Sequence, residues 1–343
     1  MLLPFVAFHP KVRAGAAAGR AASDENPMTM STAAATRFAL PGAVDTMSPV
    51  YNTEIVANAP SGLACKAYEI EEIVDIYFFR RVGLVVAHGA RLLRMTPNLV
   101  SVAAAAIGIA GGALLYDPQY AWLGFLGLVA YGVFDSADGQ LARLTGQVSD
   151  LGRVLDGVAG YVTHIAIYVA IVAGVLHRGG SASIVWVAVA AGLCTIAQAQ
   201  MYDYHRTLYA RVVVQGRPPK DVDPVALGGI LGALAGVYLA VQRALVGRHA
   251  DVERAIRNRS SSGRVTDGDR QSYRREFYSL VRGWNVLGDN GRRFAIGILV
   301  LVHHVEWFCL VVLIPCNIML AVLSLRTRQA DDRFLAQRAG SAG

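Results

Sequence analysis

The sequence predicts an all-α fold, a polytopic membrane helical bundle with six transmembrane helices. Of its 343 residues, 54% are hydrophobic and only 17% are Asp, Glu, Lys or Arg, whereas about a quarter of the residues in a soluble domain are charged. The charges are missing in blocks, several of which approach the roughly 20 residues that a membrane-spanning helix needs. Arginines gather beside these blocks, as they do at the cytoplasmic ends of membrane helices.

The first part of the chain is predicted to lie outside the bilayer core. Residues 1–60 are rich in Ala, Ser, Thr, Gly and Pro and show no helical apolar period, so we expect a poorly ordered segment. Residues 68–94 mix Glu and Arg with apolar residues at roughly helical spacing, namely Ile73, Ile76, Tyr77, Val85 and Leu92. This pattern is typical of an amphipathic juxtamembrane helix in the membrane interface. A soluble helix packed on the cytoplasmic loops is the alternative.

The membrane domain is predicted over residues 95–330. Thr96 is a suitable N-cap for the first span, and Pro97 suits its first turn. Four apolar segments form one span each: 99–116, 121–134, 154–176 and 183–201. A fifth segment, 294–325, exceeds the length of one span, and His303, His304 and Glu306 divide it into a hairpin of two. These segments give six crossings.

One more apolar stretch, 225–246, is rich in glycine and has to be placed separately. With six spans, the arginines of residues 203–292 lie on the same side as Arg91 and Arg94, as the positive-inside rule requires. A seventh crossing would export one of these basic groups. We therefore expect 225–246 to be an interfacial or re-entrant helix within a cytoplasmic segment of about 203–292, and residues 331–343 to form a C-terminal tail.

Composition also excludes several kinds of function. The net charge of +7 comes largely from arginines beside apolar runs, which the membrane surface explains, and no nucleic-acid-binding motif is present. We expect the lipid bilayer as a partner and no nucleic acid. The four cysteines form no CxxC pair, so neither a zinc site nor a disulfide scaffold is predicted.

The chemistry is predicted to lie where the second span meets the third. Asp135, Asp138 and Ala142 share one helix face, and four residues follow at intervals of four on the next span: Gly152, Asp156, Gly160 and His164. A carboxylate at membrane depth costs roughly 2.5–3.5 kcal/mol, and converging carboxylates also repel. A divalent cation with oxygen ligands relieves both costs, so we expect Asp135, Asp138 and Asp156 to bind metal. The alternative is that these carboxylates bind no metal and simply lie in a cytoplasmic loop beside Arg143 and Arg153. That would explain one Asp, but not three at helical spacing across two adjacent spans.

In this region the sequence resembles the CDP-alcohol phosphatidyltransferase family. The family signature is D-x2-D-G-x2-A-R-x8-G-x3-D-x3-D, and these residues match it in register: Asp135, Asp138, Gly139, Ala142, Arg143, Gly152 and Asp156. The resemblance covers about residues 70–330. It implies a phospholipid synthase that transfers a phosphatidyl-type group from a CDP-linked lipid alcohol, such as CDP-diacylglycerol, to an acceptor hydroxyl with release of CMP.

The resemblance also implies residue roles and a location. Asp135, Asp138 and Asp156 would hold Mg2+ or Mn2+, as two ions, at the diphosphate. The CDP moiety would be contacted by Gly139, Ala142, Arg143, Ser149, Gly152, Asn98 and Ser101. The implied protein is a homodimer in the membrane, which in a bacterium is the inner or plasma membrane, with its active site facing the cytoplasm.

The chain departs from the signature at Gly160, where the family has a fourth Asp that acts as general base and completes the metal shell. A positioned base typically contributes about 10²–10⁴-fold to a rate. Several explanations stay open. His164, one helical turn later, replaces the base; a phosphorylated acceptor deprotonates its own hydroxyl; or Asp150 moves in from the loop. Otherwise the protein is a catalytically impaired, CDP-lipid-binding regulator or scaffold.

The acceptor is expected to be a small polar or phosphorylated alcohol. Arg292 and Arg293 are candidates for a pocket that binds an acceptor phosphate, although the positive-inside rule explains them equally well. Glycerol phosphate, inositol phosphate, serine and an amino alcohol all remain open. A transporter would need inverted repeats with broken helices, and no such pairing of the two halves is visible in the sequence.

Overall fold

The computed structural model describes residues 68–219, 240, 242–260 and 263–339, and within these ranges the chain forms helices and turns without a β-strand. The all-α fold predicted from the sequence is confirmed for this part of the chain. The segment 1–60 lies outside the described residues, and so do residues 220–239 and 241, which make up most of the glycine-rich stretch 225–246.

The juxtamembrane segment is helical, as its apolar spacing predicts. A 3-10 turn (Tyr68–Ile70) and a π-helical turn (Asp75–Phe79) lead into α2 (Arg80–Leu92). Small residues of α2, including Ala87 and Ala90, are buried against α4. The predicted apolar stripe faces outward, and four of its members are exposed: Ile73, Tyr77, Val85 and Leu92. An apolar face without a protein partner suits the membrane interface, where its placement remains a prediction.

Three long helices follow, α3 (Pro97–Ala113), α4 (Ala121–Thr145) and α5 (Asp150–His177), and α3 packs against both α4 and α5. The expected N-cap is present, because the Thr96 side chain accepts a hydrogen bond from the Leu99 amide at 3.3 Å. Glycines allow α3 and α4 to approach closely. A Cβ atom at Gly111 would lie 2.9 Å from the backbone of Gly127. Small residues at such a crossing are characteristic of membrane helix pairs.

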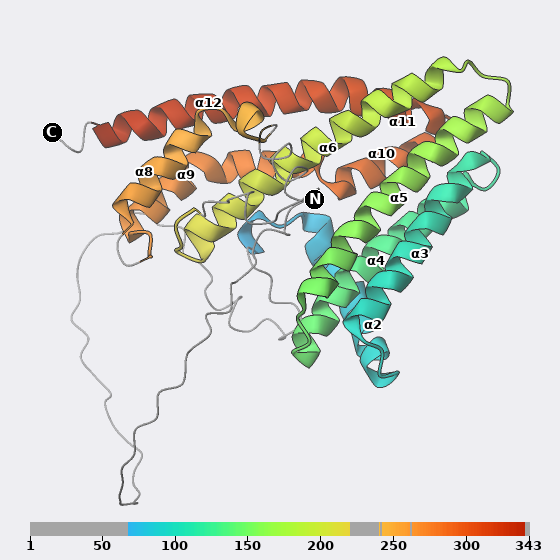
Figure 1. Cartoon of the computed structure of the whole chain (residues 1–343), viewed down its shortest axis with the longest axis horizontal. Coiled ribbons are helices and arrows are strands. Elements are labelled where there is room, and N and C mark those ends of the chain that lie inside the picture. Colours follow the sequence, from blue (N-terminus) through green and yellow to red (C-terminus); the bar gives the residue numbers. More distant parts are fainter. Residues whose placement is uncertain (1–67, 220–239, 241, 261–262, 340–343) are drawn as a thin grey trace, which may run out of the picture.

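The second half of the bundle consists of α6 (Ser183–Tyr209), α10 (Asp289–Leu301), α11 (Phe308–Val311) and α12 (Asn317–Ala339). The predicted break within 294–325 is present, because α10 ends at Leu301 and the chain turns through His303, which has a positive φ of 60°. A π-helical turn (Val312–Cys316) around Pro315 joins α11 to α12. The turns after α3, α5 and α10 lie toward the right-hand end of the molecule in Figure 1.

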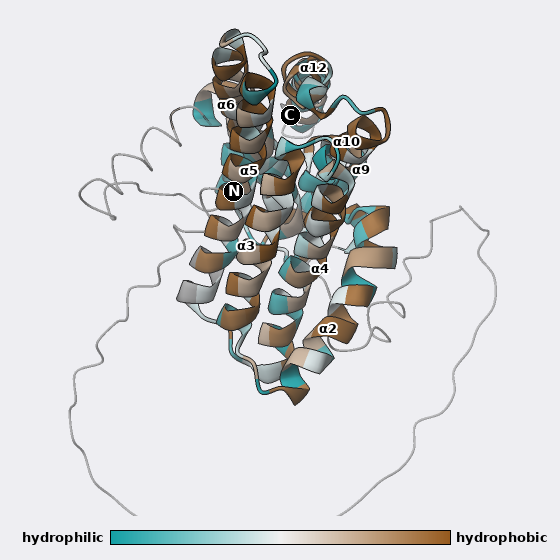
Figure 2. Ribbon diagram, turned by 90° about the vertical axis from the view of Figure 1, so that its right-hand side faces the viewer, coloured by the Kyte–Doolittle hydropathy of each residue, from teal (hydrophilic) through white to brown (hydrophobic). Residues whose placement is uncertain are grey.

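Four helical segments are long and apolar enough to cross a membrane: Pro97–Tyr116, Leu155–His177, Ser183–Val214 and Val305–Arg338. Figure 2 shows apolar residues along α3, α5 and α6. The other two predicted spans are also helical. However, α4 carries acidic residues near its end, and α10 has only 13 residues. These four apolar helices indicate an integral membrane protein. The predicted number of six crossings remains a prediction.

The predicted cytoplasmic segment contains two further helices, α8 (His249–Arg259) and α9 (Asp267–Trp284). In Figure 1 they lie beside the C-terminal half of α12, and a buried aromatic core joins them to it through Tyr273, Phe277 and Phe334. Helix α12 continues to Ala339 and so includes most of the segment expected to be a tail.

Candidate functional site

The motif carboxylates lie on α4 and α5, and each contacts a neighbour within the bundle. Asp138 is 6% exposed, and its Oδ2 accepts a hydrogen bond of 2.5 Å from the Ser101 hydroxyl on α3. Asp135 accepts a hydrogen bond of 3.4 Å from the Tyr131 hydroxyl. The carboxyl group of Asp156 on α5 lies close enough to that of Asp135 for the two to interact electrostatically. Two carboxylates so placed repel each other unless a proton or a cation lies between them.

This proximity bears on the predicted metal site. Within the described residues, no group of three or more Asp, Glu, His or Cys side chains is arranged to hold a metal ion. The donor types nevertheless fit a hard divalent cation, because Asp135, Asp138 and Asp156 offer carboxylate oxygens from two adjacent helices. A cation placed between Asp135 and Asp156 would relieve the repulsion between them. The metal site is therefore chemically reasonable and remains a proposal.

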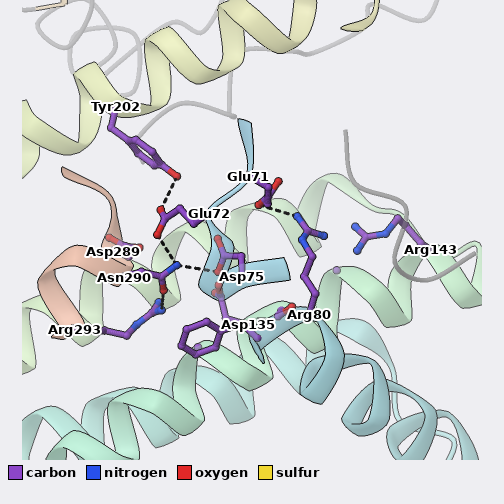
Figure 3. A pocket seen from close by; sticks show the side chains of 14 residues that line it. Glu71, Glu72, Asp75, Arg80, Asp135, Arg143, Tyr202, Asp289, Asn290 and Arg293 are labelled. Atoms are coloured by element: carbon purple, nitrogen blue, oxygen red, sulfur yellow. Dashed lines mark hydrogen bonds and ion pairs between the residues drawn. The ribbon is translucent and has the colours of Figure 1, made fainter. Parts of the chain in front are cut away.

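A polar cavity of about 270 Å³ opens beside Asp135. It lies between α2, α4, α6 and α10, and Figure 3 shows its side chains. The lining residues of α4 include Gly132, Asp135, Gly139 and Arg143, so the motif helix forms one wall. A Cβ atom at Gly139 would be 3.5 Å from the Arg143 guanidinium, so glycine leaves room there for a ligand.

The other residues expected to contact CDP gather at the start of α5. The Ser149 hydroxyl caps this helix by accepting a hydrogen bond of 3.0 Å from the Gly152 amide. A Cβ atom at Gly152 would lie 3.0 Å from Oδ1 of Asn98, which places Asn98 of α3 directly against α5. Ala142 is half-buried on α4. The structure thus brings Asn98, Ser149 and Gly152 together, and their role with a nucleotide stays a prediction.

The two arginines proposed for the acceptor have different surroundings. Arg293 lines the cavity, donates a hydrogen bond of 2.6 Å to Asn290 Oδ1 and lies over the Phe79 ring at 5.1 Å. Arg292 is 4% exposed and donates to the Thr195 carbonyl at 3.4 Å, away from the cavity lining. Arg293 alone is therefore positioned to meet a molecule in the cavity.

The residues at the missing fourth Asp form a third group. Gly160 is buried, and its carbonyl accepts a hydrogen bond of 2.8 Å from Nδ1 of His164. The opposite ring nitrogen, Nε2, is 3.8 Å from Oδ1 of Asp289 at the start of α10. His164 is absent from the cavity lining, whereas Asp289 belongs to it. Asp150 has a side chain outside the described set, so its suggested movement is untested.

Several cavity residues were not expected from the sequence. They come from the turn before α2 and from α10: Glu71, Glu72, Asp75, Asp289 and Asn290. The amide of Asn290 donates to Glu72 at 2.8 Å and to Asp75 at 2.9 Å, which ties these two segments together (Figure 3). The only sequence signal was an Asp-Asn pair in the first turn of a helix, which is also a common capping pattern.

The two glutamates before α2, Glu71 and Glu72, differ in how their surroundings shift their pKa values. Burial raises the pKa of Glu72 to about 7, and the nearby Asp75 carboxylate adds to this, although the Asn290 amide opposes it. Burial also acts on Glu71, but the Arg206 and Arg80 guanidinium groups outweigh it and lower its pKa. Arg80 lies 3.0 Å and Arg206 2.5 Å from Glu71 Oε1. Arginine thus compensates the charge of Glu71. Glu72 instead accepts from the Asn290 amide and the Tyr202 phenol, and Asp75 accepts from the Asn290 amide.

Together, the fold and the cavity define a class of protein, namely a helical membrane protein with a polar cavity that carboxylate and guanidinium groups line. Residues 94–248 match the family model described as CDP-alcohol phosphatidyltransferase. The resemblance carried by the motif is thereby confirmed for this segment, which is similar to the CDP-alcohol phosphatidyltransferases. No curated protein and no solved structure was found to match the chain.

The match ends at the residue before α8. It includes α3 to α6, with all the motif residues and His164. Asp289, Asn290 and Arg293 lie beyond it. The wall of the cavity on α4 thus lies within the matched segment, whereas the lining residues before and within α2 and those of α10 lie outside it.

Proposed function

We propose that this protein is a metal-dependent phosphotransferase of phospholipid biosynthesis, which transfers a substituted phosphoryl group from a CDP-linked lipid alcohol to a small alcohol and releases CMP. The observation that carries the proposal is the polar cavity that Asp135, Arg143 and Arg293 line, with Asp156 close enough to Asp135 to interact with it electrostatically. The family match over the same helices supports the reaction class.

Each wall of the cavity has a role in this proposal. Asp135, Asp138 and Asp156 would hold Mg2+ or Mn2+, which when bound neutralises charge on the diphosphate. Ser101 orients the Asp138 carboxylate through its hydrogen bond. Gly139 leaves room for the nucleotide, and Arg143 offers a cation at the same wall.

The alternative is a CDP-lipid-binding protein that does not turn its ligand over. It is favoured by one observation, the glycine at position 160 in place of the family's base. The two proposals predict the same ligand and the same metal. They differ only in CMP release.

The first test is CMP release by detergent-purified protein with Mg2+ or Mn2+, CDP-diacylglycerol and each of the four acceptor types. We expect release with one acceptor, abolished by EDTA and reduced about 100-fold or more by Asp138→Ala, because a bound cation stabilises developing charge by several kcal/mol. Asp117→Ala is a matched control, since Asp117 lies in the turn between α3 and α4 and its side chain accepts a hydrogen bond from the Gln119 amide.

Binding of CDP-diacylglycerol without release of CMP under any of these conditions would favour the alternative. Absence of binding as well as release would reject both proposals.

A further inference from the structure

We propose that Asp289, at the start of α10, supplies the general-base carboxylate that Gly160 lacks, with His164 as a positioning residue behind it. This inference rests on the proposed transfer reaction and adds a residue to it. Asp289 lies outside the segment that matches the family model, and it lines the same cavity as Asp135.

The contacts of Asp289 leave part of its carboxylate available. Arg292 Nη1 donates to Oδ1 at 3.3 Å, and His164 Nε2 is 3.8 Å from the same oxygen. In the described part of the chain, no hydrogen-bond donor reaches Oδ2. The side chain is 30% exposed, and that exposure is toward the cavity it lines. A carboxylate anchored by one oxygen and open at the other suits proton transfer from a bound hydroxyl.

The orientation of His164 follows from its hydrogen bond. A carbonyl oxygen can only accept, so Nδ1 of His164 carries the proton that is donated to Gly160. Nε2 therefore faces Asp289, at a distance too long for a hydrogen bond but short enough for an ion pair when the ring is protonated. Because His164 does not line the cavity, it acts through Asp289.

The helices explain how one carboxylate can replace another. In the family signature the base projects from the face of α5 that carries Asp156, one turn further along. In this chain the same face carries Gly160, then His164, and His164 contacts the first turn of α10. Asp289 of α10 thus supplies to the cavity the carboxylate that position 160 of α5 lacks.

The step is balanced without a further reactant. The acceptor hydroxyl loses its proton to Asp289 Oδ2, and its oxygen forms a bond to the lipid-linked phosphorus. The bond from that phosphorus to the bridging oxygen breaks, and CMP leaves with the electron pair. Asp289 then releases the proton to water.

The test compares Asp289→Asn with a closely matched control, Asp267→Asn. Both aspartates are the first residue of a helix, and both pair through Oδ1 with an arginine three residues later, at 3.3 Å for Asp289 and 3.0 Å for Asp267. We expect Asp289→Asn to lower kcat for CMP release about 10²–10⁴-fold and to leave the KM for CDP-diacylglycerol within about twofold. Asp267→Asn should match the wild type.

Rescue separates a base from a structural residue. The double variant Gly160→Asp/Asp289→Asn restores the family's own carboxylate and should regain most of the lost kcat. His164→Asn should lower kcat less than Asp289→Asn does. Failure of the rescue, with Asp267→Asn still active, would overturn the inference, and so would a His164→Asn loss larger than that of Asp289→Asn.

The remaining outcomes distinguish this inference from the proposed function. Wild-type CMP release that Asp289→Asn leaves unchanged overturns the inference alone. A silent wild type beside an active Gly160→Asp overturns the inference and supports the binding-protein alternative. Silence from both, with every acceptor, rejects the proposed function and this inference together.

Discussion

At the residue scale, Glu72 shows how a buried carboxylate couples the cavity wall to pH. It faces four charged or polar side chains: Asp75, Asn290, Tyr202 and Arg206. Its pKa in the folded protein is about 7, above the ordinary value of 4.5. Between these pH values the folded state binds more protons than the unfolded state, so this residue makes the protein less stable as pH rises from about 4.5 to 7.

We therefore expect Glu72→Gln to raise the Tm in detergent at pH 8. Glutamine resembles the protonated acid and can still accept from Asn290. The gain is up to about 3 kcal/mol and should shrink toward zero near pH 4, where the native Glu72 is protonated in both states. Thermal unfolding at pH 4, 6 and 8 measures this. Glu306→Gln, in the turn beyond α10, controls for the loss of one charge. A gain of equal size at every pH would contradict the assignment.

At the element scale, the crossing of α3 and α4 depends on the absence of side chains. A Cβ atom at Gly111 would lie 2.9 Å from the backbone atoms of Gly127 and Leu128, and backbone cannot rotate away as a side chain can. Gly192 on α6 is also in the middle of an apolar helix, but nothing lies within 4 Å of its Cβ position. The two glycines are thus a natural pair for comparison.

Gly111→Ala is expected to destabilise the protein by about 1–3 kcal/mol, because the added methyl group forces the helices apart. Gly192→Ala should be neutral or stabilise by up to about 1 kcal/mol, because alanine favours a helix over glycine. Unfolding in detergent, followed by the Tm, distinguishes them. Equal effects of the two substitutions would show that α3 and α4 are not in close contact at Gly111.

At the scale of the whole molecule, a buried polar cluster fastens α8 and α9 to the end of α12. His249 Nδ1 lies 2.5 Å from Asp331 Oδ1, and its Nε2 lies 3.0 Å from the Tyr273 hydroxyl. His249 and Asp331 are both 0% exposed. The next residue, Asp332, is exposed and pairs with Arg248 at the surface.

These neighbouring aspartates should differ greatly in their effect on stability. Asp331→Ala leaves His249 buried without its partner, and breaking a buried pair typically costs about 3–5 kcal/mol. Asp332→Ala removes a surface pair, for which the loss is about 0–1 kcal/mol. We expect a large drop in Tm, and proteolytic release of the α8–α9 segment, only for Asp331→Ala. Similar Tm values for the two variants would mean that the cluster does not hold these helices.

The six-crossing topology can be tested on the whole molecule as well. Single cysteines at Asp117, Ser181 and His304, in a chain without the four native cysteines, should all react with an impermeant reagent from the outer face. Cysteines at Gln147 and Gln215 should react only from the cytoplasmic face. The cysteine at position 304 tests whether α10 crosses the membrane. If α10 does not cross, this cysteine lies on the cytoplasmic side and does not react from the outer face.

The sequence by itself determined what depends on local periodicity and on fixed spacing. The helical class, the hairpin break at His303 and the Thr96 cap all follow from patterns within a few turns of chain. The motif from Asp135 to Asp156 gave the resemblance that the family model matches, because those residues lie on two consecutive helices joined by a short turn. The sequence also showed that Gly160 lacks a carboxylate.

Only the tertiary structure decided which distant residues share the cavity. Glu72 and Asn290 are 218 positions apart and form a 2.8 Å hydrogen bond. The distinction between Arg292, buried against Thr195, and Arg293, facing the cavity, depends on the rotation of α10 about its axis. Packing of α10 against α4, together with its part in a buried apolar cluster that also includes residues of α5 and α6, sets that rotation, and no local pattern encodes it. The same packing brings Asp289 to His164, so the candidate replacement for the missing base became visible only in three dimensions.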